Sequence, residues 1–192
     1  MTALAQFAPP ARQTLIRAAI LAGEAGQDRL TDEYLLLALA ESQPLSRPVE
    51  LGITADMVRA QVRLASPGRG DRELLATLGI DLDEVRRRAA GATSLRRDDP
   101  ALWQLRRSRT RPLRVTLSGP AAQLVLAESG RKVIEVAGWA SRRGNRPLAS
   151  REDLLWGLLA DASSESVAIL RRCQADTAGL WSSVQRWHRS AS

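Results

Sequence analysis

The sequence predicts an all-α protein made of two tandem, pseudo-symmetric four-helix repeats. The stretch EYLLLAL at 33–39 recurs as EDLLWGL at 152–158, 119 positions further along the chain. The preceding segment 7–16 matches 126–135 at the same offset, and no gap is needed. Self-similarity at a fixed offset is the mark of a duplicated structural unit. No segment keeps the apolar–polar alternation of a strand, so we expect helices alone.

The first repeat is expected over residues 1–66. Pro9 suits the start of a helix over 9–23, where apolar residues keep the spacing of one buried face. Thr31 is a good N-cap for the next helix, and Glu33 places negative charge in its first turn. The leucines that follow are apolar nearly all round, so we expect this helix to be central and buried.

The rest of the first half is also predicted to be helical. Residues 51–59 are typical of a short helix, a glycine turn and a second helix capped by Thr54. A similar Leu-Gly-Ile turn recurs 27 positions later, where Asp81 and Glu84 fit a capping box. We therefore expect an additional helix pair over 67–92, packed on the first repeat.

An arginine-rich linker is expected over 93–117, because that segment is polar and lacks a sustained apolar face. The second repeat follows over 118–192. Its first helix begins early, at the apolar residues 121–126. Ser150 and Asp153 form an S-x-x-D capping box that opens the second glutamate–leucine helix, and two further helices complete the unit.

Composition restricts the function classes. The chain has 192 residues, 44% apolar content and a net charge of +7, almost wholly from arginine because Lys132 is the only lysine. No apolar run approaches the roughly 18 to 20 residues that cross a bilayer, and residues 1–6 lack a secretory-signal pattern, so we expect a cytoplasmic protein. One cysteine, Cys173, and one histidine, His188, allow no internal disulfide and no metal cluster, so we expect no cofactor.

Together, these features resemble the Clp N-terminal domain, the double repeat at the front of ClpA- and ClpC-type unfoldases. The resemblance covers most of the chain. It rests on the phenylalanine-led first helix at Phe7, the glutamate–leucine helices at 33–39 and 152–158, and the Leu-Gly-Ile turn at 51–53. It implies an all-α double repeat that binds substrates, adaptors or small peptides.

The sequence departs from this family in three respects. Family members usually carry Thr-Glu-His before the leucines, whereas the triplets here are Asp-Glu-Tyr at 32–34 and Arg-Glu-Asp at 151–153. Leu126 replaces the aromatic residue that opens the second repeat. No G-x-x-x-x-G-K-[ST] phosphate loop is present, so the ATPase is missing and we expect no enzymatic activity.

The resemblance marks two sets of candidate ligand residues. Glu33 and Glu152 match glutamates that receive the guanidinium of phosphorylated arginine, although the helix dipole alone also favours a carboxylate in a first turn. A second surface, at the head of each first helix, receives adaptors and cyclic peptide antibiotics in related domains. It is matched here by Phe7, Arg12, Leu126, Arg131, Ile134 and Glu135. Packing is an equal alternative for Phe7 and the favoured one for Leu126.

The leading hypothesis is a non-catalytic binding module of a Clp protease system, with Clp unfoldase or protease subunits, adaptors or client proteins as partners. It either delivers clients to a separate unfoldase or competes with the N-terminal domain of that unfoldase for ligands. The alternative is a nucleic-acid-binding regulator that uses the arginine run at 86–114 around Trp103. A peptidase is least favoured, because no nucleophile motif accompanies His188.

Overall fold

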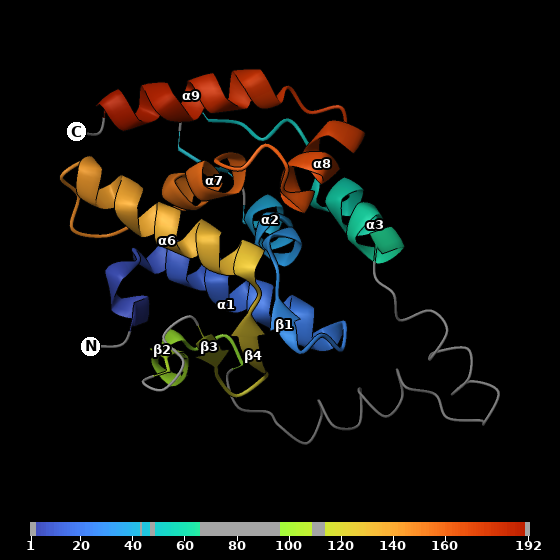
Figure 1. Ribbon diagram of the computed structural model, residues 1–192, viewed down its shortest axis with the longest axis vertical. Coiled ribbons are helices and arrows are strands. Elements are labelled where there is room, and N and C mark those ends of the chain that lie inside the picture. Colours follow the sequence, from blue (N-terminus) through green and yellow to red (C-terminus); the bar gives the residue numbers. More distant parts are fainter. Residues whose placement is uncertain (1–2, 43, 47–48, 66–96, 109–113, 191–192) are drawn as a thin grey trace.

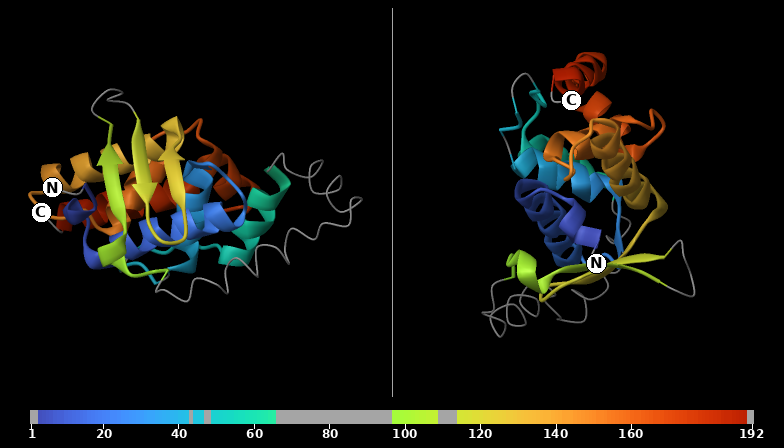
Figure 2. Two further views of the ribbon diagram at one scale, coloured as in Figure 1. Left: turned by 90° about the horizontal axis from the view of Figure 1, so that it is seen from below. Right: turned by 90° about the vertical axis from the view of Figure 1, so that its left-hand side faces the viewer.

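The computed structural model describes residues 3–42, 44–46, 49–65, 97–108 and 114–190. Within these residues the chain forms seven α-helices, two short 3-10 helices and one four-stranded sheet. The helices stack on one side of the sheet, with α1 next to the sheet and α9 farthest from it (Figures 1 and 2). None of the helices in these residues is long and apolar enough to cross a membrane.

The first half begins with a 3-10 helix, η1, and its elements are η1 (Ala3–Gln6), α1 (Pro9–Glu24), β1 (Arg29–Leu30), α2 (Asp32–Glu41) and α3 (Ala55–Ala65). Proline opens α1, as expected. Thr31 stands in extended backbone before α2 but makes no side-chain capping bond. Thr54 does cap α3, because its Oγ1 accepts a hydrogen bond from the Met57 N–H at 3.3 Å.

The second half contains the other three strands and four helices. Its elements are η2 (Pro100–Leu102), β2 (Gln104–Arg107), β3 (Val115–Ser118), β4 (Gln123–Leu126), α6 (Glu128–Arg143), α7 (Arg151–Leu159), α8 (Glu165–Arg172) and α9 (Thr177–Ser190). The capping box is confirmed at α7. Asp153 N–H donates to Ser150 Oγ at 3.3 Å, and Ser150 N–H donates to Asp153 Oδ2 at 2.8 Å.

The sheet corrects the all-α prediction. Its strand order is β1-β4-β3-β2, and only the β1–β4 pair is parallel. Each strand has two to four residues, which is too short for alternation to stand out, and β1 pairs with a strand almost a hundred positions away. The apolar residues at 124–126, expected to start a helix early, belong to β4 instead. Strand β2 and part of β3 lie in the segment assigned to a linker, 93–117.

Corresponding elements of the two halves keep the offset of 119 residues. Helices α1 and α6 have 16 residues each and are followed by left-handed residues, Gly26 (φ 74°) and Asn145 (φ 56°). A parallel bridge joins Phe7 to Ala149, and its counterpart joins Leu126 to Leu30. The match is incomplete, because the described residues in 44–54 contain no helix, so the short helix expected before Gly52 is not found among them. Two complete four-helix repeats therefore remain a prediction.

The two halves share one hydrophobic core. Buried residues of α1 and α2 form a continuous cluster with those of α6, α7 and the sheet. Polar contacts also cross between the halves. Ser166 N–H donates to Asp32 Oδ2 at 2.9 Å, and Asp32 is itself only 2% exposed. The helix pair expected over 67–92 lies outside the described residues, and the predicted domain boundaries stay predictions.

Candidate functional site

A pocket of about 190 Å³ lies between α6 and the sheet, and we call it the sheet pocket. Its walls come from both halves of the chain. It is lined by Gln6, Leu105, Arg107, Val115, Leu126, Arg131, Ile134, Glu135, Gly138 and Arg142. Four of the eight candidate residues from the sequence are therefore brought together here: Leu126, Arg131, Ile134 and Glu135.

The floor of the sheet pocket is apolar. Leu105, Val115 and Leu126 are buried on the inward face of the sheet, and Ile134 is buried on α6. Strand alternation explains the arrangement, because successive side chains point to opposite faces, so β2 buries Leu105 while Arg106 is exposed. A ligand that covered this floor would bury an apolar group there.

The rim of the sheet pocket carries charge. Glu135 Oε1 is 3.1 Å from Arg107 Nη2 and 3.5 Å from Arg131 Nη1, so one carboxylate lies beside two guanidinium groups. Exposed ion pairs of this kind contribute only about 0 to 1 kcal/mol each. A ligand carboxylate or guanidinium can therefore replace one of them at little cost.

Phe7 and Arg12 do not line the sheet pocket. Phe7 is 0% exposed, and the strand-like bridge to Ala149 holds its backbone, so the structure gives it a packing role. Arg12 is half-buried on α1, and its Nε is buried without a hydrogen-bond partner among the described residues. The residue that reaches the pocket from this end of the chain is Gln6.

Glu33 and Glu152 occupy the second position of α2 and α7 but have different surroundings. Glu152 is 3% exposed, and its Oε1 accepts a hydrogen bond from the Ser46 N–H of the other half at 2.8 Å. Burial opposes ionisation of Glu152, but hydrogen bonds from Ser46 and Ser150 lower its pKa below the ordinary value. Glu33 is half-buried, and burial raises its pKa, with a further contribution from the nearby carboxylates.

Sequence reasoning missed the strand residues of the sheet pocket. Arg107 supplies its shortest ion pair, yet it belonged to a segment expected to be a linker. The sequence did contain a strand signal, the apolar–polar alternation of Val115-Thr116-Leu117-Ser118, and the burial of these residues alternates in the same way. Four residues were too few to distinguish this pattern from chance.

The nucleic-acid alternative relied on Trp103 as an accessible aromatic ring within the arginine run, and the structure buries that ring. Trp103 is 2% exposed, and its Nε1–H donates to the Arg97 carbonyl at 2.7 Å. A ring held in this way has no free face on which a base could stack. The exposed arginines at 106 and 107 keep only the nonspecific attraction that cations have for phosphate.

No protein-family model matches this sequence, and no curated protein matches it. A solved structure does match, the N-terminal domain of the caseinolytic protease associated chaperone ClpD from Arabidopsis thaliana. It is 17% identical, and the alignment covers 97% of this chain and 96% of that one with a TM-score of 0.59. The chain therefore has a fold like that of a Clp N-terminal domain.

Proposed function

We propose that this chain is a non-catalytic binding module of a Clp protease system, and that it takes a peptide segment of a client, an adaptor or a small cyclic peptide at the sheet pocket. The observation that carries the proposal is the meeting of Leu126, Arg131, Ile134 and Glu135 around one pocket, in a fold shared with the N-terminal domain of a Clp chaperone. The module either delivers clients to an unfoldase or competes with it for ligands.

The chemistry of the pocket suits a peptide with an apolar side chain and a charged neighbour. The apolar group would cover the floor at Leu126 and Ile134, at about 25 cal/mol for each Å² removed from water. A carboxylate of the ligand would pair with Arg107 or Arg131, while a guanidinium would pair with Glu135. The pocket is shared by two halves of the chain, so its shape depends on both.

Phosphoarginine recognition is a separate proposal, and it favours Glu33 over Glu152. The carboxylate of Glu152 is buried and already accepts the Ser46 N–H, whereas Glu33 is half-buried and Arg172 lies near enough to act on its charge. A charge-assisted hydrogen bond contributes about 1.5 to 3 kcal/mol. Glu33→Ala should therefore weaken binding of a phosphoarginine peptide by roughly ten- to a hundredfold, as measured by calorimetric titration. Unchanged affinity would leave Glu33 without a ligand role.

Affinity capture from native cells tests the main proposal. Wild-type protein, Arg107→Glu and Arg106→Glu would be used as baits, and the bound molecules identified. Arg107 lines the sheet pocket and pairs with Glu135, whereas its neighbour Arg106 is exposed outside it, so the second variant is a control for charge alone. We expect Clp subunits, adaptors or clients on wild type and Arg106→Glu, and at least about a tenfold loss on Arg107→Glu.

Two outcomes would contradict the proposal. Equal capture by all three baits would remove the sheet pocket from binding. Capture of nucleic acid in place of Clp components, lost in both arginine variants, would instead favour the nucleic-acid-binding regulator. The purified protein should also hydrolyse neither ATP nor peptides, and turnover that disappears on mutation of this chain would overturn its non-catalytic role.

A further inference from the structure

A second pocket, of about 290 Å³, lies between α6, α7 and α9, and we call it the aromatic pocket. It shares no lining residue with the sheet pocket. We propose that it binds the C-terminal residue of a peptide, with an apolar side chain against its tryptophans and the free carboxylate beside its arginines. This site goes beyond the function proposed above.

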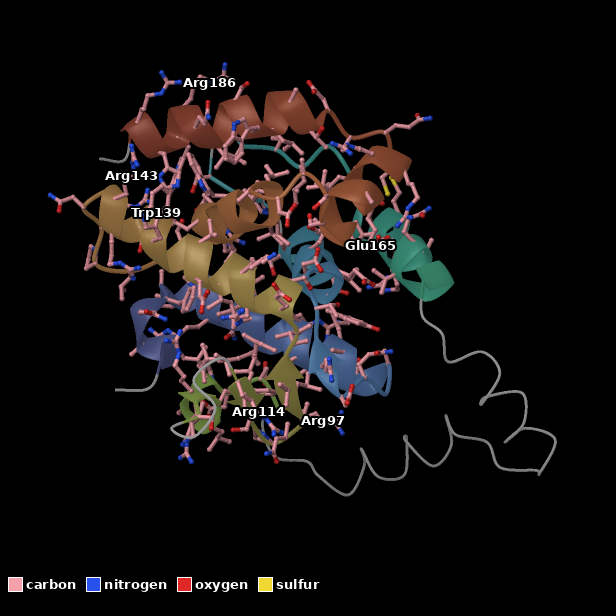
Figure 3. The ribbon with its side chains drawn as sticks, in the orientation of Figure 1. Arg97, Arg114, Trp139, Arg143, Glu165 and Arg186 are labelled. Carbon is pink, nitrogen blue, oxygen red and sulfur yellow. The ribbon has the colours of Figure 1, made fainter. Side chains whose placement is uncertain are left out.

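The aromatic pocket is built from three helices that are distant in the sequence. Its lining residues are Trp139, Ala140, Arg143 and Gly144 at the end of α6, Trp156 of α7, and Gln185, His188 and Arg189 of α9. Figure 3 shows Trp139 and Arg143 near the end of α6 that lies closest to α9. Helices α6 and α9 both end at this pocket, and each contributes an arginine from its last turn, Arg143 and Arg189.

The walls of the aromatic pocket are tryptophan rings. Trp139 is 45% exposed, although it is one of the largest apolar side chains in the chain. Trp156 is held in place, because its ring lies 4.7 Å from that of Trp181 and 4.4 Å from that of His188. One fixed ring and one exposed ring thus face the same space, which is a surface that an apolar side chain can cover.

The charges of the aromatic pocket are cationic. Arg143 lies over the Trp139 ring at 5.2 Å, and Arg189 is exposed on α9. Among the described residues that line the pocket, none is a carboxylate. Burial and the Arg146 guanidinium lower the pKa of His188 to about 4, so its ring adds no charge at neutral pH.

Two buried acids interact with His188, and both already have other partners: Glu152 accepts the Ser46 N–H, and Asp153 pairs with Arg146. Asp153 is 0% exposed, and its Oδ1 lies 2.5 Å from Arg146 Nη2, so its charge is paired with that guanidinium, while the uncharged His188 ring lies 3.0 Å away. A cation in the last turn of a helix is favoured by the helix dipole, which explains an arginine at 143. The dipole gives no reason for an exposed tryptophan four residues before it.

These features together select the end of a peptide. The pocket offers an apolar wall and positive charge, so its ligand needs an apolar body and a negative charge close to each other. The last residue of a peptide carries both on one carbon atom when its side chain is apolar. An internal aspartate or glutamate supplies the charge without the apolar body, and inorganic phosphate supplies no apolar surface at all.

The test compares a free carboxylate with its amide. The probe is a fluorescently labelled glycine–serine peptide that ends in phenylalanine, leucine or tryptophan, made with a free C-terminus and with a C-terminal amide. Fluorescence anisotropy gives the affinity for wild type. We expect the free acid to bind about ten- to a hundredfold more tightly than the amide, as for the loss of one charge-assisted hydrogen bond.

Variants then locate the site. The double variant Arg143→Gln, Arg189→Gln and the single variant Trp139→Ala should each weaken the free acid by about tenfold or more. Both change exposed side chains, so the fold should be kept, and circular dichroism checks this. Arg186→Gln is the matched control, because Arg186 is exposed on α9 but does not line the pocket.

The site is overturned by any of three results. These are no binding of any of the three free acids, equal affinity for acid and amide, or an equal effect of Arg186→Gln. Arg107→Glu separates this site from the sheet pocket, because a loss of peptide affinity in Arg107→Glu that the aromatic-pocket variants do not show would place the peptide at the sheet pocket and overturn this site. Capture of Clp components without peptide binding would support the proposed function and overturn this second site. Peptide binding without capture of Clp components would support this site and contradict the proposed function.

Discussion

Replacing Glu152 should destabilise the protein far more than replacing Glu33, although both occupy the second position of a helix at the same point of the sequence repeat. Glu152→Ala removes the acceptor of the Ser46 N–H, whereas no comparable bond is seen for Glu33 among the described residues. Both variants lose the same favourable interaction with the helix dipole, which is below about 1 kcal/mol. The difference between them therefore reports the surroundings that only Glu152 has, chiefly the hydrogen bond from Ser46.

A hydrogen bond to a charged acceptor contributes about 1.5 to 3 kcal/mol. Ser46 is itself exposed, so water can take over part of this bond, and we expect the lower end of the range, about 1.5 kcal/mol. A chain of this length changes its melting temperature by roughly 2 to 4 °C for each kcal/mol. Glu152→Ala should accordingly melt about 3 to 6 °C below Glu33→Ala at neutral pH.

The pH dependence of thermal stability is a second test of the hydrogen bond between Ser46 and Glu152. The pKa of Glu152 is lowered in the folded protein, so its stabilisation is present above the ordinary pKa of 4.5 and is lost as the pH falls through the lower folded value. The gap between the two variants should therefore close in acid. Thermal unfolding followed by circular dichroism from pH 7 to pH 3 measures both effects. Equal melting temperatures at neutral pH would show that the Ser46 bond contributes nothing.

Two further predictions concern packing and protonation. Gly157→Ala should lower the free energy of urea unfolding by about 1 to 3 kcal/mol, because a Cβ there would lie 2.4 Å from the Val133 carbonyl oxygen. Gly138→Ala should be neutral or stabilise by up to about 1 kcal/mol, because its Cβ would meet only the end of Arg142 at 3.4 Å. The opposite order would contradict the close packing of α6 on α7. The melting temperature of wild type should fall more steeply from pH 6.5 to pH 4 than that of His188→Gln. The pKa of His188 drops from 6.5 to about 4 on folding, so the unfolded chain takes up the proton first as the pH falls. Parallel curves would mean that burial and Arg146 do not disfavour the charged ring.

The helices were predictable because their signals are local. Proline at the start of α1 and the Ser150–Asp153 box before α7 each lie within a few residues of the backbone groups they serve. The strands were missed because their evidence is distant. Leu126 belongs to an apolar run that fits a helix start equally well, and only its pairing with Leu30 makes it a strand residue.

The candidate site was predictable to the same extent. Arg131, Ile134 and Glu135 share one face of α6 through their three- and four-residue spacing, so their proximity follows from helix geometry. Arg107 reaches Glu135 only because β2 and β3 form a hairpin beside α6. The hydrogen bond from Ser46 to Glu152 could not be predicted either, because Ser46 lies in the other half of the chain.

The bridge between Phe7 and Ala149 has a consequence for biosynthesis. Ala8 N–H donates to the Ala149 carbonyl at 2.8 Å, so this segment finds its partner only after more than a hundred further residues have been synthesised. At about 5 to 20 residues per second, the N-terminal segment waits roughly 7 to 28 s on the ribosome for that partner. During this interval Phe7 lacks its bridge partner Ala149. The backbone pairing at the start of the first half is therefore completed only when most of the second half has been synthesised.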